Sequence, residues 1–246
     1  MSEVLSVVQN WRRPANVAAV VDAIRSQTIP SKLAVVDCGL DGYALPPDVL
    51  AKADYVFRVD RANLGPCCRF IPSMMIPQIP LTMFWLDDFL PGPRCLESFL
   101  RHRDLLLRRE AVTIGQDGRV FADDCTIIRR RQYAEAGQTV ESDVIVSTEL
   151  CLTREVHNAI RFRDFMVDEY GADRISLFED DLYLCLGIRR HLGVRSRVFT
   201  PQDEAESHRS ARLSSAHALA SRPDHDARRK EFVELALKWC QPLTPT

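Results

Sequence analysis

The sequence contains little lysine, little glycine and no long apolar run. Only four of its 32 basic residues are lysine, so arginine supplies nearly all of the positive charge. Arginine favours bidentate contacts with phosphate and carboxylate groups, although a GC-rich genome produces the same bias. The formal net charge is −2 at pH 7, which predicts no strong non-specific attraction to nucleic acid or to a membrane surface.

The cysteines show no spacing typical of a zinc or redox motif. There are eight, with no C-x-x-C pair, and most lie within apolar runs, where cysteine acts as a small hydrophobic residue. The chain does not open on a basic and then apolar signal segment, and no apolar run approaches the length of a membrane span. These absences predict reduced thiols, a cytoplasmic protein and no membrane span.

Short apolar runs alternate with amphipathic segments in the first ninety residues. A length of 246 residues with 46% hydrophobic content suits one α/β domain, or one domain with a tail. Helices are predicted after Pro14 and within residues 67–79. Strands are predicted at Val4–Val8, Leu33–Val36, Tyr55–Val59 and Met83–Leu86. This alternation indicates a wound, mostly parallel twisted sheet of Rossmann type, flanked by helices.

The second half of the chain is less regular. Two runs around the turn Gln116-Asp117-Gly118, residues 111–114 and 120–121, predict a β-hairpin. Residues 201–226 are polar, which predicts a mobile loop. We therefore expect a single domain over residues 1–200, with residues 201–246 forming a flexible basic loop and a closing helix. Further strands are predicted at Val144–Val146 and Ile175–Phe178, and helices at Cys95–Leu100, Val156–Met166, Leu182–Leu192 and Phe232–Trp239.

Two adjacent carboxylates follow the buried run Met83–Leu86. Asp87 and Asp88 stand where α/β sheets place their ligands, and Pro91 closes the segment soon afterwards. Neighbouring carboxylates repel each other unless a cation or a proton intervenes. Their hard oxygen ligands favour Mg²⁺ or Mn²⁺. A solvated Asp-Asp turn is the alternative interpretation.

Polar groups also follow other predicted strands. Because the carboxyl ends of parallel strands meet at one edge of a sheet, such groups together define a cleft. The strand ends that carry them are Asn10 with Arg12, Asp37, Asp87-Asp88, and Glu179-Asp180-Asp181.

In these motifs the sequence resembles the GT-A-fold glycosyltransferases, the nucleotide-sugar-dependent class that includes the family-two-like and exostosin-like enzymes. The resemblance covers roughly residues 4–200, and the motifs occur in the same order. It is carried by the opening strand and turn Ser6–Asn16, by Val35–Gly39, by Asn63-Leu64-Gly65 with Arg69, by Trp85–Asp88 at the D-x-D position, and by Glu179-Asp180-Asp181.

The resemblance implies a site for a nucleotide-sugar donor, most simply a UDP-sugar, with Mn²⁺ or Mg²⁺. It assigns Asp88 to the metal and Asp87 to ribose or sugar hydroxyls, and it places Arg69 at a phosphate. Leu86 occupies the first acidic position of D-x-D, so two carboxylates remain for the metal site. Four further residues are expected to bind the nucleotide: Asn10, Arg12, Asp37 and Asn63.

The resemblance also implies an acceptor-side acid and a late closing segment. Asp180 is expected to act as the general base of an inverting enzyme, with Glu179 orienting it. An acidic first turn favoured by the helix dipole is the alternative. His208 is preferred as a late metal ligand because it follows the last strand, with His217 and His225 as the other candidates. Arg228 and Arg229 are expected at the diphosphate, under a loop that excludes water.

Other functions stay open at this point. A nucleotidyltransferase usually has a Gly-rich basic loop after its first strand, and residues 9–14 contain no glycine. A non-catalytic nucleotide- or glycan-binding module would not need both acidic motifs. The acceptor could be a cell-surface or lipid-linked glycan, or 5-hydroxymethylcytosine in DNA, as in small phage DNA glycosyltransferases. Arginine clusters that could track DNA phosphates lie at residues 101/103, 108–109, 129–131 and 189–190.

Overall fold

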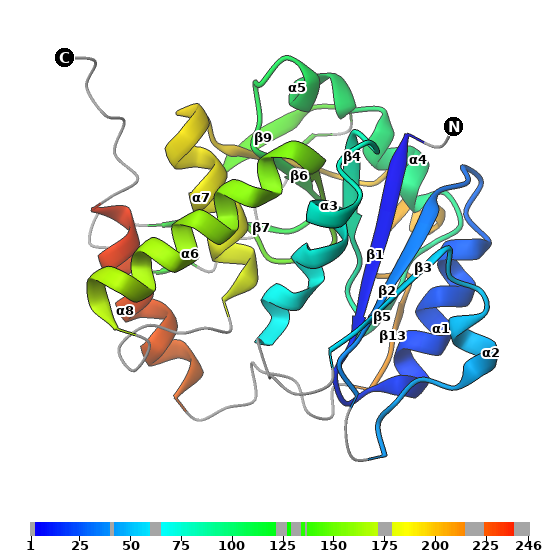
Figure 1. The fold of residues 1–246 in the computed structure, drawn as a ribbon. Helices are drawn as coiled ribbons and strands as arrows, with labels where there is room; N and C mark the ends of the chain where they lie inside the picture. The colour runs from blue at the N-terminus through cyan, green and yellow to red at the C-terminus, as the bar shows by residue number, and fades with distance from the viewer. Residues whose placement is uncertain are drawn as a thin grey trace.

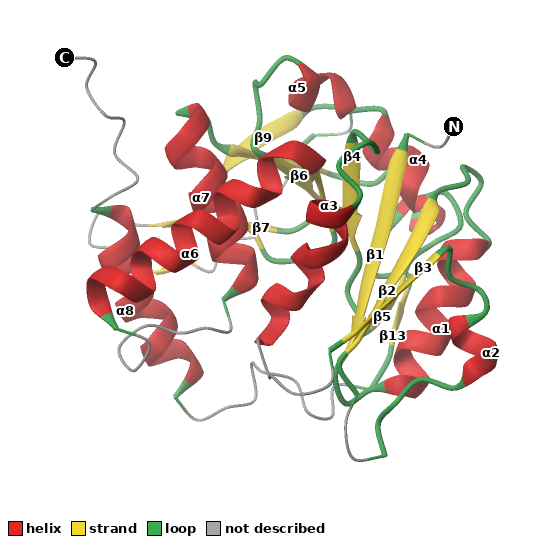
Figure 2. Ribbon diagram, viewed as in Figure 1, coloured by secondary structure: helices red, strands yellow, loops and turns green. Residues whose placement is uncertain are grey.

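The computed structural model describes residues 3–39, 42–59, 65–121, 127–128, 134–135, 137–171, 179–214 and 224–238. An eight-stranded sheet forms its centre (Figure 1, Figure 2). Neighbouring strands from β3 to β4 are parallel, β6 pairs in parallel with β12, and β11 and β9 run antiparallel to their neighbours. The sheet order is β3 (Tyr55–Arg58), β2 (Lys32–Asp37), β1 (Val4–Asn10), β4 (Leu81–Phe84), β11 (Glu149–Leu152), β6 (Thr113–Gly115), β12 (Ser196–Phe199) and β9 (Thr139–Ser142). The predicted mostly parallel α/β sheet flanked by helices is confirmed.

Helices cover both faces of the sheet, because alternate strand residues point to opposite sides. In β1, Leu5 and Val7 belong to one buried cluster, while Val4 and Val8 belong to the other. The first cluster includes residues of η1 (Gly65–Phe70), α6 (Val156–Tyr170), α7 (Asp180–Leu192) and α8 (His225–Leu237). The second includes residues of α1 (Pro14–Arg25), α2 (Pro47–Leu50), α4 (Cys95–Leu100) and α5 (Arg103–Leu107).

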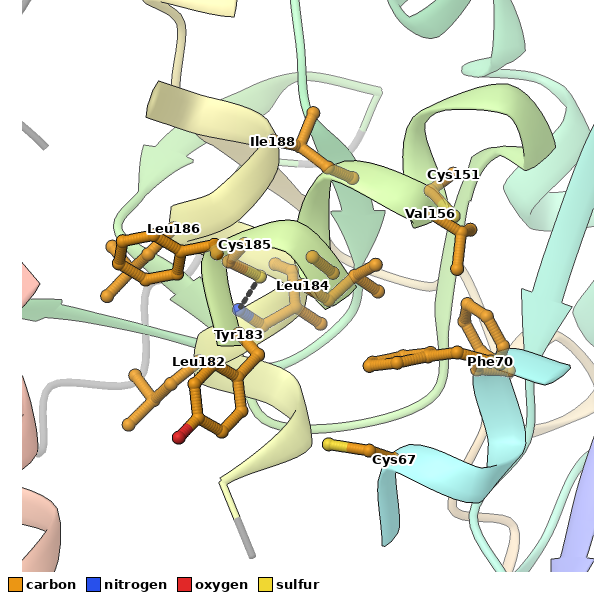
Figure 3. Packing of buried hydrophobic residues seen from close by; sticks show 14 of the residues in the cluster. Cys67, Phe70, Cys151, Val156, Leu182, Tyr183, Leu184, Cys185, Leu186 and Ile188 are labelled. Atoms are coloured by element: carbon orange, nitrogen blue, oxygen red, sulfur yellow. Dashed lines mark hydrogen bonds between the residues drawn. The ribbon is translucent and has the colours of Figure 1, made fainter. Parts of the chain in front are cut away.

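The pair α6 and α7 packs closely on the first face. Gly187 permits this approach, since a Cβ there would lie 2.8 Å from the Cα of Ala159. Gly193, with φ of 72°, ends α7 in the left-handed conformation that glycine favours. Tyr183 is fully buried, and its ring lies edge-on to Phe232 of α8 with the centroids 4.8 Å apart. Figure 3 shows Tyr183 and its neighbours on α7 in this cluster.

The predicted hairpin is wrong. Both edges of β6 are already occupied, by β11 and β12, so β7 (Gly118–Phe121) cannot pair with it. The chain bends at Asp117, whose carboxylate lies 2.9 Å from the Arg209 guanidinium. β7 instead joins a small sheet between β10 (Val144–Ile145) and β8 (Ile127–Ile128).

Other segments differ in detail from the sequence-based expectations. The predicted helix in residues 67–79 is the 3-10 helix η1 followed by α3 (Ile71–Met75), and the last helix begins earlier, at His225. Residues 201–214 hold the 3-10 helix η3 (Glu204–Glu206) and β13 (Ala211–Arg212), which pairs with β5 (Phe89–Leu90). The predicted strand at 175–178 lies outside the described residues. Another 3-10 helix, η2 (Thr153–Glu155), precedes α6.

The expectation that residues 201–246 form a flexible basic loop and a closing helix stays a prediction. Within the described ranges, no helix combines the length and the apolar character that crossing a membrane requires.

Candidate active site

The carboxyl ends of β1 and β2 are joined through a buried amide and a buried carboxylate. Asn10 Nδ2 donates to Asp37 Oδ1 at 2.7 Å and to the carbonyl oxygen of Tyr43 at 2.8 Å. Asp37 also accepts the backbone N–H groups of Gly39 and Leu45, each at 3.2 Å. The Asp37 carboxylate therefore shapes the loop that follows β2, and the predicted pair Asn10 and Asp37 lies together.

An aromatic and cationic border surrounds this pair. The exposed guanidinium of Arg12 lies 4.7 Å from the ring centroid of Trp11 and 5.8 Å from that of Tyr43. Gly39 packs directly against the Tyr43 backbone, because a Cβ there would lie 2.1 Å from the carbonyl oxygen of Tyr43. Flat rings beside hydrogen-bonding groups suit a nucleobase. Asn63, also predicted to bind the nucleotide, lies outside the described residues.

Asp87 is held by an arginine that the sequence analysis did not select. Arg13, the residue before α1, forms an ion pair with Asp87 Oδ1 at 2.7 Å. Burial raises the pKa of Asp87 to about 6, with Arg13 opposing this shift and Asp88 adding to it. The sequence offered a weak signal for Arg13, since it stands beside Arg12 in the turn after β1.

Four buried polar atoms at the ends of β1 and β4 and at the start of α1 have no hydrogen-bond partner among the described residues. They are Asn10 Oδ1, Arg13 Nη1, Trp85 Nε1 and Asp88 Oδ1. A buried polar atom without a partner costs about 1–3 kcal/mol. Two of these atoms accept hydrogen bonds and two donate them, so a polar ligand with both kinds of group would satisfy them. Asp88 Oδ1 in addition fits a hard divalent cation.

The acidic run at the start of α7 meets a buried arginine. Arg69 on η1 lies with its Nε 2.6 Å from Asp180 Oδ2 and its Nη2 2.7 Å from Glu149 Oε1. Glu149, on β11, is fully buried. Burial raises the pKa of both carboxyl groups, and the Arg69 charge opposes each shift. Both ion pairs of Arg69 go to carboxylates, so its contact with a phosphate stays a prediction.

The two acidic motifs share one electrostatic environment. The negative charge of Asp180 is among the causes that raise the pKa of Asp87. Coulombic effects of this kind weaken with distance and with solvent between the groups. The Arg69 guanidinium, which contacts Asp180 at the start of α7, also lies 5.0 Å from the ring centroid of Phe84, the last residue of β4. The end of β4 and the start of α7 therefore lie close to the same arginine.

Glu179 and Asp181 are held by a different arginine, on the C-terminal helix. Arg229 Nη1 lies 2.8 Å from Glu179 Oε2, and its Nη2 lies 2.6 Å from Asp181 Oδ2. The structure thus brings Arg229 to the acidic run. Arg228 is exposed and pairs with Asp224 along the same helix, so it is not brought to the other site residues.

His208 and Asp88 are not brought together. The backbone N–H of Leu213 donates to the carbonyl oxygen of Asp88 at 2.8 Å, whereas His208 follows Ser207, whose carbonyl oxygen accepts the N–H of Gly92 at 2.8 Å. His208 is buried, with Nδ1 2.8 Å from Gln116 Oε1. Within the described ranges, no group of three or more His, Cys, Asp or Glu side chains could hold a metal. His217 and the side chain of His225 lie outside the described residues.

Sequence reasoning also missed Glu149. The sequence does contain a sign of a buried acid here, since Glu149 begins the apolar run Glu149–Leu152, and a buried strand would enclose its side chain. An acid in such a place requires a buried partner. No strand was predicted at residues 149–152, so this acid was not expected to be buried.

Most of the described members of the arginine clusters that could track DNA phosphates pair with carboxylates of the protein itself. Arg101 lies 2.5 Å from Glu206, and Arg189 lies 2.7 Å from Asp143. Arg190 lies over the ring of Phe165, at 4.8 Å from its centroid. The cluster at residues 129–131 lies outside the described residues. The other described members form ion pairs as well: Arg103 with Glu3, Arg108 with Asp104, and Arg109 with Glu155.

Comparison with known proteins identifies the fold. No family model matches the chain, and no curated protein sequence matches it. The crystal structure of Staphylococcus aureus TarS is similar, with a TM-score of 0.51 and 13% identity, over 82% of this chain and 36% of that one. A TarS fragment of residues 1–349 gives a TM-score of 0.46 at 12% identity, over 83% and 59% of the two chains. The fold is GT-A-like, and the chain spans about a third of the TarS chain that it matches.

Proposed function

We propose that this protein is a metal-dependent glycosyltransferase that moves a sugar from a nucleotide-sugar donor, most simply a UDP-sugar, to a hydroxyl group. The observation that carries the proposal is that two acidic motifs, one after β4 and one at the start of α7, lie near each other beside a GT-A-like sheet. Asp88, after β4, has a buried oxygen without a partner among the described residues. Asp180, at the start of α7, is oriented by Arg69.

The donor would lie against the carboxyl ends of β1, β2 and β4. Asn10 and Asp37 would bind the base or ribose, with the rings of Trp11 and Tyr43 and the Arg12 guanidinium at the border. Asp87 would bind ribose or sugar hydroxyls. Asp88 would hold Mn²⁺ or Mg²⁺, which when bound neutralises charge on the departing diphosphate.

The acceptor side would supply the base. The Asp180 carboxylate takes the proton of the acceptor hydroxyl while the acceptor oxygen bonds to the anomeric carbon of the sugar. The bond between that carbon and the diphosphate breaks, and its electron pair leaves on the diphosphate oxygen. Burial raises the pKa of Asp180, which brings its basicity closer to neutral pH and suits general-base catalysis.

The acceptor is proposed only as a hydroxyl compound. Hydroxymethylated DNA and a lipid-linked or cell-surface glycan both carry such a group. The internal ion pairs of Arg101, Arg103 and Arg189 leave those arginines fewer free donors for DNA phosphates. No contact of the described residues favours DNA over a glycan.

A donor-cleavage assay tests the proposal. The protein would be incubated with UDP-, GDP- and ADP-sugars, with Mn²⁺ or with EDTA, and with acceptors that include hydroxymethylated DNA and simple glycans. We expect release of one nucleoside diphosphate, dependent on Mn²⁺ and lost in Asp180→Asn. The exposed Asp164 on α6 provides a control, and Asp164→Asn should keep full activity.

Two outcomes would contradict the proposal. Pyrophosphate release from a nucleoside triphosphate and a sugar phosphate would support a nucleotidyltransferase instead. Tight nucleotide binding without cleavage of any donor, across the whole acceptor panel, would support a binding module.

A further inference from the structure

We propose that Glu149 is a positioning residue for Asp180: the two carboxyl groups form a coupled pair on the single guanidinium of Arg69 and hold one proton between them at intermediate pH. Its catalytic meaning rests on the proposed function, in which Asp180 is the base. The coupling itself is a property of the folded chain and can be measured without any substrate.

The geometry joins three separate elements at one cation. Arg69 comes from η1, Glu149 from β11 and Asp180 from α7, and the guanidinium contacts the carboxylates at 2.7 Å and 2.6 Å. The Arg69 guanidinium also lies 5.0 Å from the ring centroid of Phe84, which restricts its movement. One positive charge thus faces the fully buried Glu149 and the largely buried Asp180, whose side chain is 17% exposed. If both acids were ionised, one negative charge would remain without compensation inside the protein, and this is costly.

Other charged and titratable groups act on Asp180, but they contact other partners. Arg229 of α8 is bound to Glu179 and Asp181, so it does not replace Arg69 as the direct partner. Arg69 is the cation that contacts Asp180 among the described residues. The further groups whose charges interact with Asp180 are Asp181 on α7, Asp87 after β4 and Cys67 on η1.

The reaction itself brings the pair to its one-proton state, because it starts above the upper titration step, where both carboxylates are ionised. When Asp180 takes the acceptor proton it becomes neutral, and a buried Arg69 with no other partner would be left without a counter-ion. Glu149 keeps Arg69 paired at that moment. Without Glu149, Asp180 would be the sole counter-ion of Arg69, would hold its negative charge more firmly and would be a weaker base.

Carbon-13 NMR of carboxyl groups, in protein labelled at Asp and Glu side chains, tests the coupling. In the wild-type protein we expect both the Glu149 and the Asp180 carboxyl carbons to shift in two common titration steps. Glu149→Gln should leave one step for Asp180, at least one pH unit below the upper wild-type step. Asp180→Asn should do the same for Glu149, and it also assigns the signals.

A matched control separates coupling from the general loss of a buried acid. Glu155, on η2, is also buried but contacts Asn158 and Arg109 instead of Arg69. Glu155→Gln should leave both titration steps unchanged. If each carboxyl carbon of the wild-type protein follows a single independent step, the inference is wrong, whether or not the Glu149→Gln variant folds.

The pH profile of nucleotide release separates failure of this inference from failure of the proposed function. Glu149→Gln should move the acidic limb of the profile to lower pH and reduce the plateau rate. Coupled titration without donor cleavage would overturn the proposed function and leave the pair intact. Cleavage with an unchanged Asp180 titration in Glu149→Gln would overturn the pair alone.

Discussion

The two halves of the candidate site differ in how many of their charged groups form ion pairs within the protein. On the donor side, Asn10, Arg13 and Asp88 each keep a buried polar atom without a partner among the described residues. On the acidic side, the carboxylates of residues 179–181 contact the arginines Arg69 and Arg229. The acidic side is thus preorganised by the fold, whereas the donor side can gain much of its stabilisation from a ligand. Changes on the acidic side should affect catalysis and folding, and changes on the donor side should affect binding.

The largest expected effect follows from Asp180→Asn. The amide cannot take the acceptor proton, so donor cleavage should fall by about 10²–10⁴-fold. Nucleotide binding, followed by calorimetry, should stay within about twofold of the wild-type protein because the donor side is intact. A comparable loss of nucleotide binding would show that the two halves are not separate.

The next effect is on stability, at the C-terminal helix. Arg229→Ala leaves the buried Glu179 and the Asp181 carboxylate without their arginine, which should lower the unfolding free energy by about 3–5 kcal/mol. The neighbouring exposed Arg228 provides a control, and Arg228→Ala should cost at most about 0.5 kcal/mol. Urea denaturation measures both. Equal losses would mean that Arg229 is no more important than a surface residue.

A smaller, pH-dependent effect is expected at Asp87. Its pKa in the folded protein is raised from 3.8 to about 6, so the folded state binds this proton more tightly than the unfolded state. The resulting stabilisation is present below the ordinary pKa and is lost as the pH rises from about 4 to about 6. Relative to Asp87→Asn, the metal-free wild-type protein should therefore lose roughly 1–3 kcal/mol over this interval. Parallel pH dependence of the two unfolding free energies would contradict the raised pKa of Asp87.

The elements that depend on local sequence pattern were predicted correctly. The apolar runs of β1, β2 and β4 and the periodicity of α1 and α7 were sufficient to place the parallel half of the sheet. The turn after β1 and the acids after β4 then followed, because side chains that follow parallel strands meet at one edge. In this way Asn10 and Asp37 were correctly expected to lie together.

Partner choice over long separations could not be predicted in the same way. Arg69 contacts Glu149, which lies 80 residues later in the chain. The local sequence around either residue does not identify its partner. The same is true of Arg229 with Asp181, a pair 48 residues apart. The hairpin prediction failed for a related reason, since the turn at Gln116-Asp117-Gly118 carries no information about the strands that already occupy both edges of β6.

Thermal unfolding with UDP, GDP, CMP and ADP, each with and without Mn²⁺, tests the central claim most directly. Binding to the folded state raises stability by about 2.7 kcal/mol at a hundredfold excess over Kd, which for a chain of 246 residues corresponds to a Tm rise of roughly 5–10 °C. We predict such a rise with UDP only when Mn²⁺ is present, and its loss in Asp88→Ala. No rise with any of the four nucleotides would contradict the account.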